Sequence, residues 1–200
     1  MKVSEVCNAN MTCFSIDTVH SLVKSQTSFQ AGELKHFSQQ WETKTTDPAI
    51  LQIVTGVELE FKNSVAPMQH YGRPSVFNSH QHPIVSAEIA KLLAKGVIIP
   101  AAQETGEFIS TIFLRPKKDG THRTILNLKA CNEFIAYHHF KMDTLKAAVN
   151  MRPGCFMASV DLKDAYYTVP IHPSHQKYFK FCLDGVFYKY TRLLLYLLNY

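Results

Sequence analysis

The chain has 200 residues, of which 46% are hydrophobic and 18% are charged. This composition is typical of a globular protein and argues against disorder throughout. The longest apolar run, Leu193–Leu198, is far shorter than the roughly 20 residues that a membrane-spanning helix needs. No apolar segment follows Lys2, so no secretory signal is visible, and the five cysteines lack zinc-finger spacing. Reduced thiols in the cytoplasm or nucleus are the simplest interpretation.

The net charge of +5 is concentrated in the second half of the chain. Residues 1–110 carry 8 Lys/Arg and 10 Asp/Glu, a balance of −2, whereas residues 111–200 carry 13 and 6, a balance of +7. A basic half suggests a polyanionic partner such as nucleic acid or a nucleotide. An ordinary solvated surface explains the charge equally well.

The first 83 residues show only weak periodicity. Residues 1–35 are polar and rich in Ser, Thr and Gln, which predicts a disordered tail. Residues 36–83 combine irregular apolar positions with three prolines within residues 62–83, which predicts short helices followed by an extended linker. Next, Ser86 is a good N-cap and Gly96 a good C-terminal stop, so the pattern predicts a helix between them. Val97–Ile99 then reads as a short strand.

Two pairs of β-rich runs are each joined by an Asp-Gly step, the strongest short-range signal for a β-hairpin. The runs are Phe108–Leu114 with Arg123–Leu128, and Tyr178–Leu183 with Val186–Tyr190. Between the hairpins, Asp143 can cap a short helix, and Phe156–Asp161 alternates as a strand does. The pattern predicts an α+β fold with antiparallel pairing.

Asp161 is the most informative single residue because it ends a predicted strand just before Leu162, where the backbone can turn. Mg²⁺ takes one or two carboxylates together with phosphate oxygens and waters, so a carboxylate at this place is a natural ligand. Two such ions about 3.5–4 Å apart clamp the attacking and leaving oxygens in phosphoryl transfer. A plain capping role for Asp161 remains open from the spacing alone.

Cations surround the first predicted hairpin turn: Arg115 precedes it, Lys117 and Lys118 lie on it, and Arg123 follows it. Cations on a turn can fold over a triphosphate, Arg as a bidentate donor and Lys as a point charge. Lysines on an edge strand also discourage aggregation, so a solvated basic edge remains the alternative.

The sequence resembles the fingers and early palm of a reverse transcriptase, which is an RNA-directed DNA polymerase. The resemblance is to the reverse transcriptases of DIRS-type retrotransposons, in the wider gypsy-like group. Four ordered motifs carry the resemblance: Glu107–Gly120, Arg123–Asn132, His138–Asp143 and Ser159–Ile171. The resemblance covers residues 84–191, with residues 36–83 as an upstream segment. It implies a reverse-transcriptase-like α+β fold of fingers and partial palm, with an RNA or DNA template–primer and a dNTP as partners.

The resemblance also implies roles for individual residues. Asp161 would be the catalytic metal ligand, and Leu162 would offer its carbonyl to the same Mg²⁺. Lys117 and Arg123 would bind the triphosphate, and Ala165 and Tyr166 would complete the nucleotide site. The ring of Tyr166 would exclude a ribose 2′-OH, the group that separates the two sugars. Lys118 and Asp164 would support the site structurally.

The sequence departs from this family after Thr191. The expected Leu-Pro-x-Gly turn is replaced by an apolar stretch over residues 192–200, and no Tyr-x-Asp-Asp motif occurs. One carboxylate cannot hold two Mg²⁺ ions with useful geometry. The sequence therefore predicts an incomplete polymerase fragment that is inactive by itself. The alternative is a non-catalytic remnant that at most binds nucleic acid.

Overall fold

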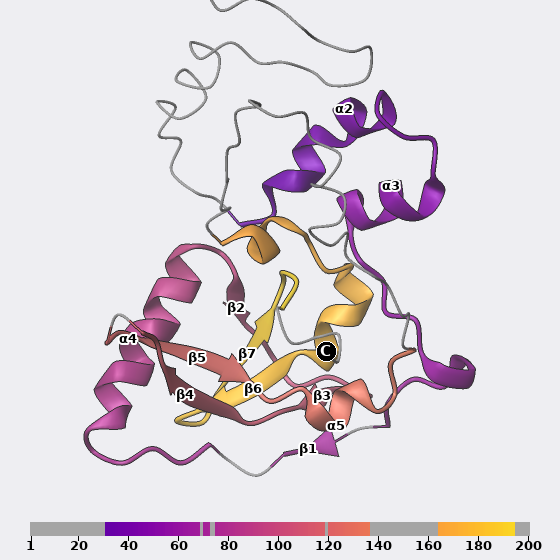
Figure 1. The fold of residues 1–200 in the computed structure, drawn as a ribbon. Helices are drawn as coiled ribbons and strands as arrows, with labels where there is room; N and C mark the ends of the chain where they lie inside the picture. Colours follow the sequence, from indigo (N-terminus) through magenta and orange to yellow (C-terminus); the bar gives the residue numbers. More distant parts are fainter. Residues whose placement is uncertain (1–30, 69, 73–74, 119, 137–163, 195–200) are drawn as a thin grey trace, which may run out of the picture.

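The computed structural model describes residues 31–68, 70–72, 75–118, 120–136 and 164–194, and Figure 1 shows their arrangement. Strands form a five-stranded sheet of order β1-β3-β6-β7-β2 and a separate two-stranded sheet, β4-β5. The strands are β1 (His70–Tyr71), β2 (Ile98–Pro100), β3 (Phe108–Ile109), β4 (Ile112–Pro116), β5 (His122–Leu126), β6 (Lys180–Leu183) and β7 (Val186–Tyr190). The helices are η1 (Glu33–Phe37), α2 (Ser38–Glu42), α3 (Pro48–Thr55), η2 (Lys62–Ser64), α4 (Gln81–Ala94), α5 (Lys129–Asn132), η4 (Ala165–Thr168) and η5 (Pro173–Tyr178). The predicted helix at Asp143 and strand Phe156–Asp161 lie outside the described residues.

Helix α4 begins five residues earlier than Ser86, the N-cap that the sequence suggested. The reason is Asn78, whose side-chain Oδ1 accepts the backbone N–H groups of His80 at 3.1 Å and Gln81 at 2.8 Å. Pro83 therefore falls in the first turn, where its missing N–H costs no helical hydrogen bond. Ser86 lies inside the helix, and its hydroxyl donates to the carbonyl of His82 at 3.0 Å.

The end of helix α4 follows the sequence prediction. Gly96 has a φ of 66°, in the left-handed region that glycine adopts without steric cost. Its N–H donates to the carbonyl of Leu93 at 2.9 Å, and the next N–H, of Val97, donates to that of Leu92 at 3.0 Å. This Schellman pattern satisfies two carbonyls at the helix end and turns the chain directly into β2.

Both Asp-Gly hairpins are confirmed. The β6–β7 turn places Asp184 at a φ of 51° and Gly185 at 79°, the two positive values of a type I′ turn. Tyr178 belongs to η5 rather than to β6.

The predicted strand Phe108–Leu114 is instead divided between the two sheets. The N–H of Ser110 donates to the carbonyl of Lys180 in β6, whereas the carbonyl of Thr111 accepts the N–H of Asn127, which follows β5. The chain therefore passes from the large sheet to the small sheet between Ser110 and Thr111.

The large sheet is mixed, so the expectation of antiparallel pairing holds for only part of it. β1 pairs with β3 and β3 with β6 in parallel, while β6–β7 and β7–β2 are antiparallel. The parallel pairs are very short, and β1 and β3 contribute two residues each. The α+β class itself is confirmed.

The core lies between α4 and the sheets, and Figure 1 shows the helix running beside β4 and β5. Val85 and Ile89 of α4 are buried together with Ile98 of β2, Leu126 of β5 and Phe181 of β6. Each large apolar side chain contributes about 1.5–3 kcal/mol when fully buried. Burial also raises the pKa of Tyr190.

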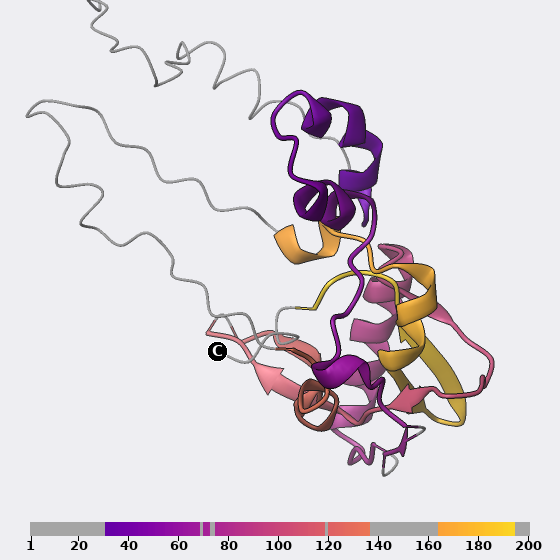
Figure 2. The same ribbon diagram turned by 90° about the vertical axis from the view of Figure 1, so that its right-hand side faces the viewer.

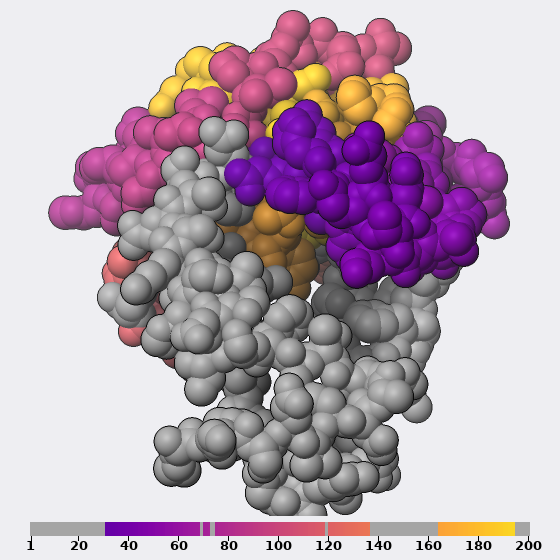
Figure 3. All heavy atoms as spheres, turned by 90° about the horizontal axis from the view of Figure 1, so that it is seen from above, coloured from indigo at the N-terminus to yellow at the C-terminus, as the bar shows by residue number. Residues whose placement is uncertain are grey.

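The N-terminal helices α2 and α3 pack against each other beside this body, as Figures 2 and 3 show. The N–H of Ala31 donates to the carbonyl of Lys95 at 3.3 Å, and that of Gly32 to the carbonyl of Tyr167 at 2.8 Å. Residues 31–35, which the sequence assigns to a disordered tail, are therefore part of the packed structure instead. At the other end, Leu193 donates to the carbonyl of Val169 at 2.9 Å, so residues 192–194 also pack on the body.

Candidate functional site

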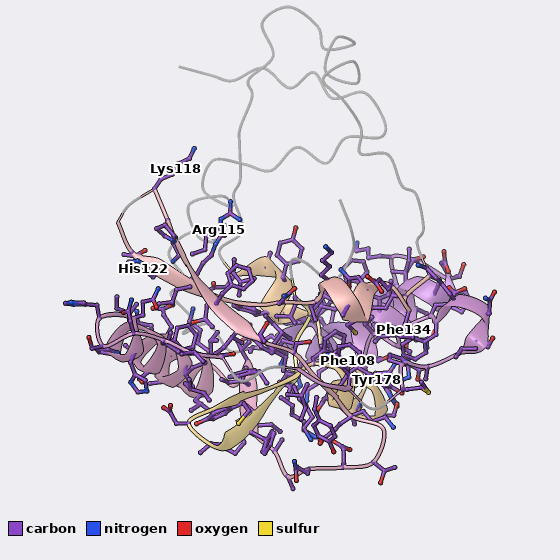
Figure 4. All side chains as sticks on the ribbon, turned by 90° about the horizontal axis from the view of Figure 1, so that it is seen from below. Phe108, Arg115, Lys118, His122, Phe134 and Tyr178 are labelled. Atoms are coloured by element: carbon purple, nitrogen blue, oxygen red, sulfur yellow. The ribbon has the colours of Figure 1, made fainter. Side chains whose placement is uncertain are left out.

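The β4–β5 hairpin carries a cluster of cations at its outer end. Arg115 and Arg123 occupy directly opposite positions in the antiparallel register, so their side chains leave the same face. The turn is closed by the Lys117 N–H, which donates to the Thr121 carbonyl at 2.7 Å, and by Gly120, whose φ is 79°. Figure 4 shows Arg115, Lys118 and His122 on this projecting hairpin, with Lys118 at its tip.

All four cations, Arg115, Lys117, Lys118 and Arg123, are exposed. Within the described residues, no carboxylate forms an ion pair with any of them. Like charges placed directly opposite on two strands are destabilising, so Arg115 and Arg123 repel each other across the ladder. An anion lying over this face would be attracted by several cations at once.

The predicted residues near Asp161 fall into two groups. Asp161 and Leu162 lie outside the described residues. Ala165 and Tyr166 begin the 3₁₀ turn η4, and the side chain of Tyr166 is about half exposed. The structure places these two residues and the cations of the hairpin on separate elements.

Asp164, just before η4, is held by the end of helix α4. Its Oδ2 accepts a hydrogen bond from Lys95 Nζ at 2.6 Å, and its backbone is left-handed, with a φ of 56°. The two side chains are 36% and 22% exposed, so the ion pair is only partly shielded from water. This contact ties the segment that follows Asp161 to the residue that ends α4.

A pocket of about 290 Å³ lies at the base of the hairpin. The imidazole of His70 and the ring of Phe108 stack with centroids 4.6 Å apart and planes 21° from parallel. Ser110 also lines it, and its buried hydroxyl has no hydrogen-bond partner among the described residues. The lining residues lie in or directly after β1, β3, β5 and α5: His70, Gly72, Phe108, Ser110, Thr111, Asn127, Lys129, Ala130 and Glu133.

This pocket, which we call the base groove, combines an aromatic stack with polar groups of both kinds. Lys129 supplies an exposed ammonium group, and Asn127 supplies an amide. A flat stack beside a cation suits the base and backbone of a single-stranded nucleic acid. No sequence pattern marks His70 or Ser110 as site residues, because the residues of the base groove come from three separated segments.

A metal centre is not formed by the described residues, which contain no group of three His, Cys, Asp or Glu side chains that could hold an ion. Across the same ranges, every helix is too short or too polar to cross a lipid bilayer. Cys131 is buried against the Tyr178 carbonyl, and burial raises the pKa of its thiol to about 12. This thiol is therefore protonated and unreactive at neutral pH.

No protein-family model matches the chain. In sequence, it is 29% identical over 116 residues to the Gag-Pro-Pol polyprotein of Simian retrovirus SRV-1, a match that covers 54% of the chain and 6% of the polyprotein. It is 33% identical over 78 residues to the Gag-Pro-Pol polyprotein of Mason-Pfizer monkey virus, which covers 39% of the chain and 4% of the polyprotein. The chain thus spans a small fraction of the length of these relatives.

In structure, the chain resembles the foamy viral protease-reverse transcriptase in complex with an RNA/DNA hybrid, with a TM-score of 0.52 and 19% identity over 83% of this chain and 25% of that one. The same viral protein in complex with dsDNA gives a TM-score of 0.51 and 22% identity, covering 72% of this chain and 28% of that one. The described residues therefore have part of a reverse-transcriptase-like fold, and part of the sequence is similar to retroviral Gag-Pro-Pol polyproteins.

Proposed function

We propose that residues 84–191 are the fingers and the first part of the palm of a retrotransposon RNA-directed DNA polymerase, of DIRS type in the gypsy-like group. The observation that carries this proposal is the hairpin on which Arg115 faces Arg123 beside Lys117. A β-hairpin that concentrates cations at a turn is suited to a polyphosphate. The reverse-transcriptase-like fold and the four sequence motifs support the same assignment.

In this proposal Lys117 and Arg123 bind the triphosphate of an incoming dNTP. Arg123 donates in bidentate geometry, and Lys117 adds a mobile point charge. Their contribution is positioning and charge neutralisation while a primer 3′-OH attacks the α-phosphate and pyrophosphate leaves. Tyr166, exposed at the start of η4 and flanked by Ala165, selects the deoxyribose by excluding a 2′-OH.

The base groove is the proposed site for the single-stranded template. The His70–Phe108 stack offers a surface for a base, and Lys129 offers a charge for a phosphate. The groove begins where β4 and β5 end their pairing, so template and triphosphate would contact opposite ends of one hairpin. RNA and DNA templates both satisfy this chemistry.

Asp161 and the carbonyl of Leu162 are the proposed ligands of a divalent ion, which we take to be Mg²⁺. When bound, such an ion would neutralise phosphate charge during the transfer. The described residues do not complete this site. Asp164, through its ion pair with Lys95, supports the position of the neighbouring segment.

Binding to nucleic acid tests the proposal directly. Fluorescence anisotropy of the 200-residue chain with labelled RNA and with primer–template should show salt-sensitive binding. In the presence of primer–template, the double variant K117A/R123A should bind a fluorescently labelled dNTP more weakly than the parent, because it lacks the two cations that the proposal places on the triphosphate. The control K35A/K44A removes the same charge from exposed positions in or next to the N-terminal helices and should bind like the parent. Equal dNTP affinity of K117A/R123A and parent would contradict the proposal.

Primer extension separates the polymerase from its alternative, a remnant that only binds. We expect the 200-residue chain to bind without synthesis, because its sequence holds no Tyr-x-Asp-Asp motif. The assay uses dNTPs, Mg²⁺ and a primed RNA template. Template-dependent synthesis that is lost in D161N would show that the chain is active by itself.

A further inference from the structure

A buried ion pair lies between the loop before β3 and strand β6. The side chains of Glu107 and Lys180 are both fully buried, and Lys180 Nζ donates a short hydrogen bond to Glu107 Oε2. The ammonium group also donates to the Ala102 carbonyl at 2.5 Å and lies 3.4 Å from Glu104 Oε1. Lys180 thus contacts three residues of the loop between β2 and β3.

Burial of such a pair is costly, since two charges must leave water. The other carboxylate oxygen, Glu107 Oε1, is buried and has no partner among the described residues. An incompletely satisfied buried charge of this kind calls for an explanation beyond stability. The surroundings of Glu107 supply one.

The backbone of Glu107 joins the buried pair to the base groove. Its carbonyl accepts the N–H of His70 at 3.1 Å, and the next residue, Phe108, forms the stack with His70. On the other side, the carbonyl of Lys180 accepts the N–H of Ser110 at 2.8 Å. The two charged residues therefore contact, through their main chains, both the aromatic and the hydroxyl parts of the groove.

Strand β1 joins the large sheet through β3. It consists of His70 and Tyr71, both exposed, and its sheet pairing is with β3. A two-residue parallel strand gains little from its own ladder, so its position depends on where β3 lies. β3 in turn is held by β6 and by the loop bound to Lys180.

We propose that Glu107 and Lys180 are positioning residues for the base groove, and that their polar contacts set His70 over Phe108 for a nucleic-acid base. This inference rests on the proposed function of the groove as a template site. In this role the pair shapes a binding surface, although neither of the two side chains lines it.

The test uses the full chain, with two variants and two readouts. The first readout is the NMR signal of the His70 imidazole, identified by its loss in H70A, because stacking on Phe108 shifts it upfield. The second is the affinity for a labelled single-stranded oligonucleotide. E107Q removes the charge, and E107L/K180M replaces the whole pair with apolar side chains, an exchange that commonly preserves stability. E88Q, which breaks the exposed pair of Glu88 with Lys91, is the matched control.

We expect E107L/K180M to melt close to the parent, while its His70 signal moves downfield and its oligonucleotide affinity falls by about fivefold. E107Q should show the same two changes, and E88Q neither. An unshifted His70 signal together with parental affinity in a folded E107L/K180M would overturn the positioning role. If the parent chain itself binds no oligonucleotide, the proposed function fails, and an unmoved His70 signal in E107L/K180M would separately defeat the positioning of His70.

Discussion

Arg115 lies directly across the β4–β5 ladder from Arg123, so two guanidinium groups leave the same face of a two-stranded sheet. Like charges at directly opposite positions destabilise a strand pair by a few tenths of a kcal/mol. A protein does not gain stability from this arrangement. In the proposed function, the charge of a bound triphosphate would relieve this repulsion.

The first prediction concerns this repulsion. R123T should raise the free energy of unfolding at low salt by about 0.5 kcal/mol, because it relieves the repulsion and adds a β-branched residue to a strand. The gain should shrink at high salt, where exposed charges are screened. Urea denaturation at two salt concentrations measures it. K118T, at the turn and outside the opposed pair, should show no such salt-dependent gain, and a loss of stability in R123T at low salt would refute the explanation.

A second prediction concerns the ion pair of Asp164 with Lys95. D164N should lower the free energy of unfolding by about 0.5–1 kcal/mol, the range for a partly exposed pair, because it removes the charge but keeps a residue that tolerates positive φ. D164A should cost more, since it also forces a Cβ-bearing residue without a polar side chain into a φ of 56°. Thermal and chemical denaturation of the two variants check the order. If the alanine variant were the more stable of the two, the left-handed backbone of residue 164 would be in doubt.

The third prediction concerns pH. His175 Nδ1 accepts the N–H of Leu59 at 2.6 Å, and the ring packs with Phe61 and Tyr178. Burial lowers the pKa of His175 in the folded chain, Glu58 raises it, and His172 and Lys177 lower it further. The unfolded chain therefore binds a proton at a higher pH than the folded chain. The stability contributed by neutral His175 is complete above the unfolded pKa of about 6.5 and is lost as the pH falls below it.

Melting temperatures across this pH range measure the effect. H175Q can still accept the Leu59 N–H through its amide oxygen but cannot titrate, so its melting temperature should depend less on pH. An equal pH dependence in H175Q and the parent would assign the effect to other groups.

A fourth prediction tests how the N-terminal helices join the body. A Cβ on Gly32 would lie 2.3 Å from Cζ of Arg192, and Gly32 has a φ of 78°. Gly185 has nearly the same φ, 79°, but open space around it. G185A should therefore cost about 1–2 kcal/mol for the backbone alone, and G32A more, because the guanidinium must also move. When Arg192 is first replaced by alanine, the guanidinium is absent. The further loss of stability from R192A to G32A/R192A should then equal the loss caused by G185A in the parent.

Sequence predicted best where a short stretch decides the structure. Asp184 and Gly185 specify a type I′ turn by their own backbone preferences, and Gly96 ends its helix in the same way. The start of α4 was predicted wrongly because both Ser86 and Asn78 can cap a helix. The structure selects Asn78, because its side chain accepts the backbone N–H groups of His80 and Gln81.

The features that sequence missed depend on distant residues. The chain passes from one sheet to the other between Ser110 and Thr111 because β6 lies on one side of it and β5 on the other. No residue pattern near these two positions marks this change. Glu107 and Lys180 are 73 residues apart, and each reads as an ordinary charge in the sequence. The cations of the first hairpin were visible because Lys117, Lys118 and Arg123 are neighbours. Their candidate role remains a prediction, as does that of Asp161.

The order of the strands in the large sheet also limits when it can assemble. β6 and β7 lie between β3 and β2, which precede them by more than 70 residues in the chain. During synthesis from the N-terminus, the edges of β2 and β3 that pair with this hairpin have no partner until β6 and β7 have left the ribosome. That hairpin closes locally and rapidly, so its arrival is the event that can convert a loose nascent chain into a cooperative sheet.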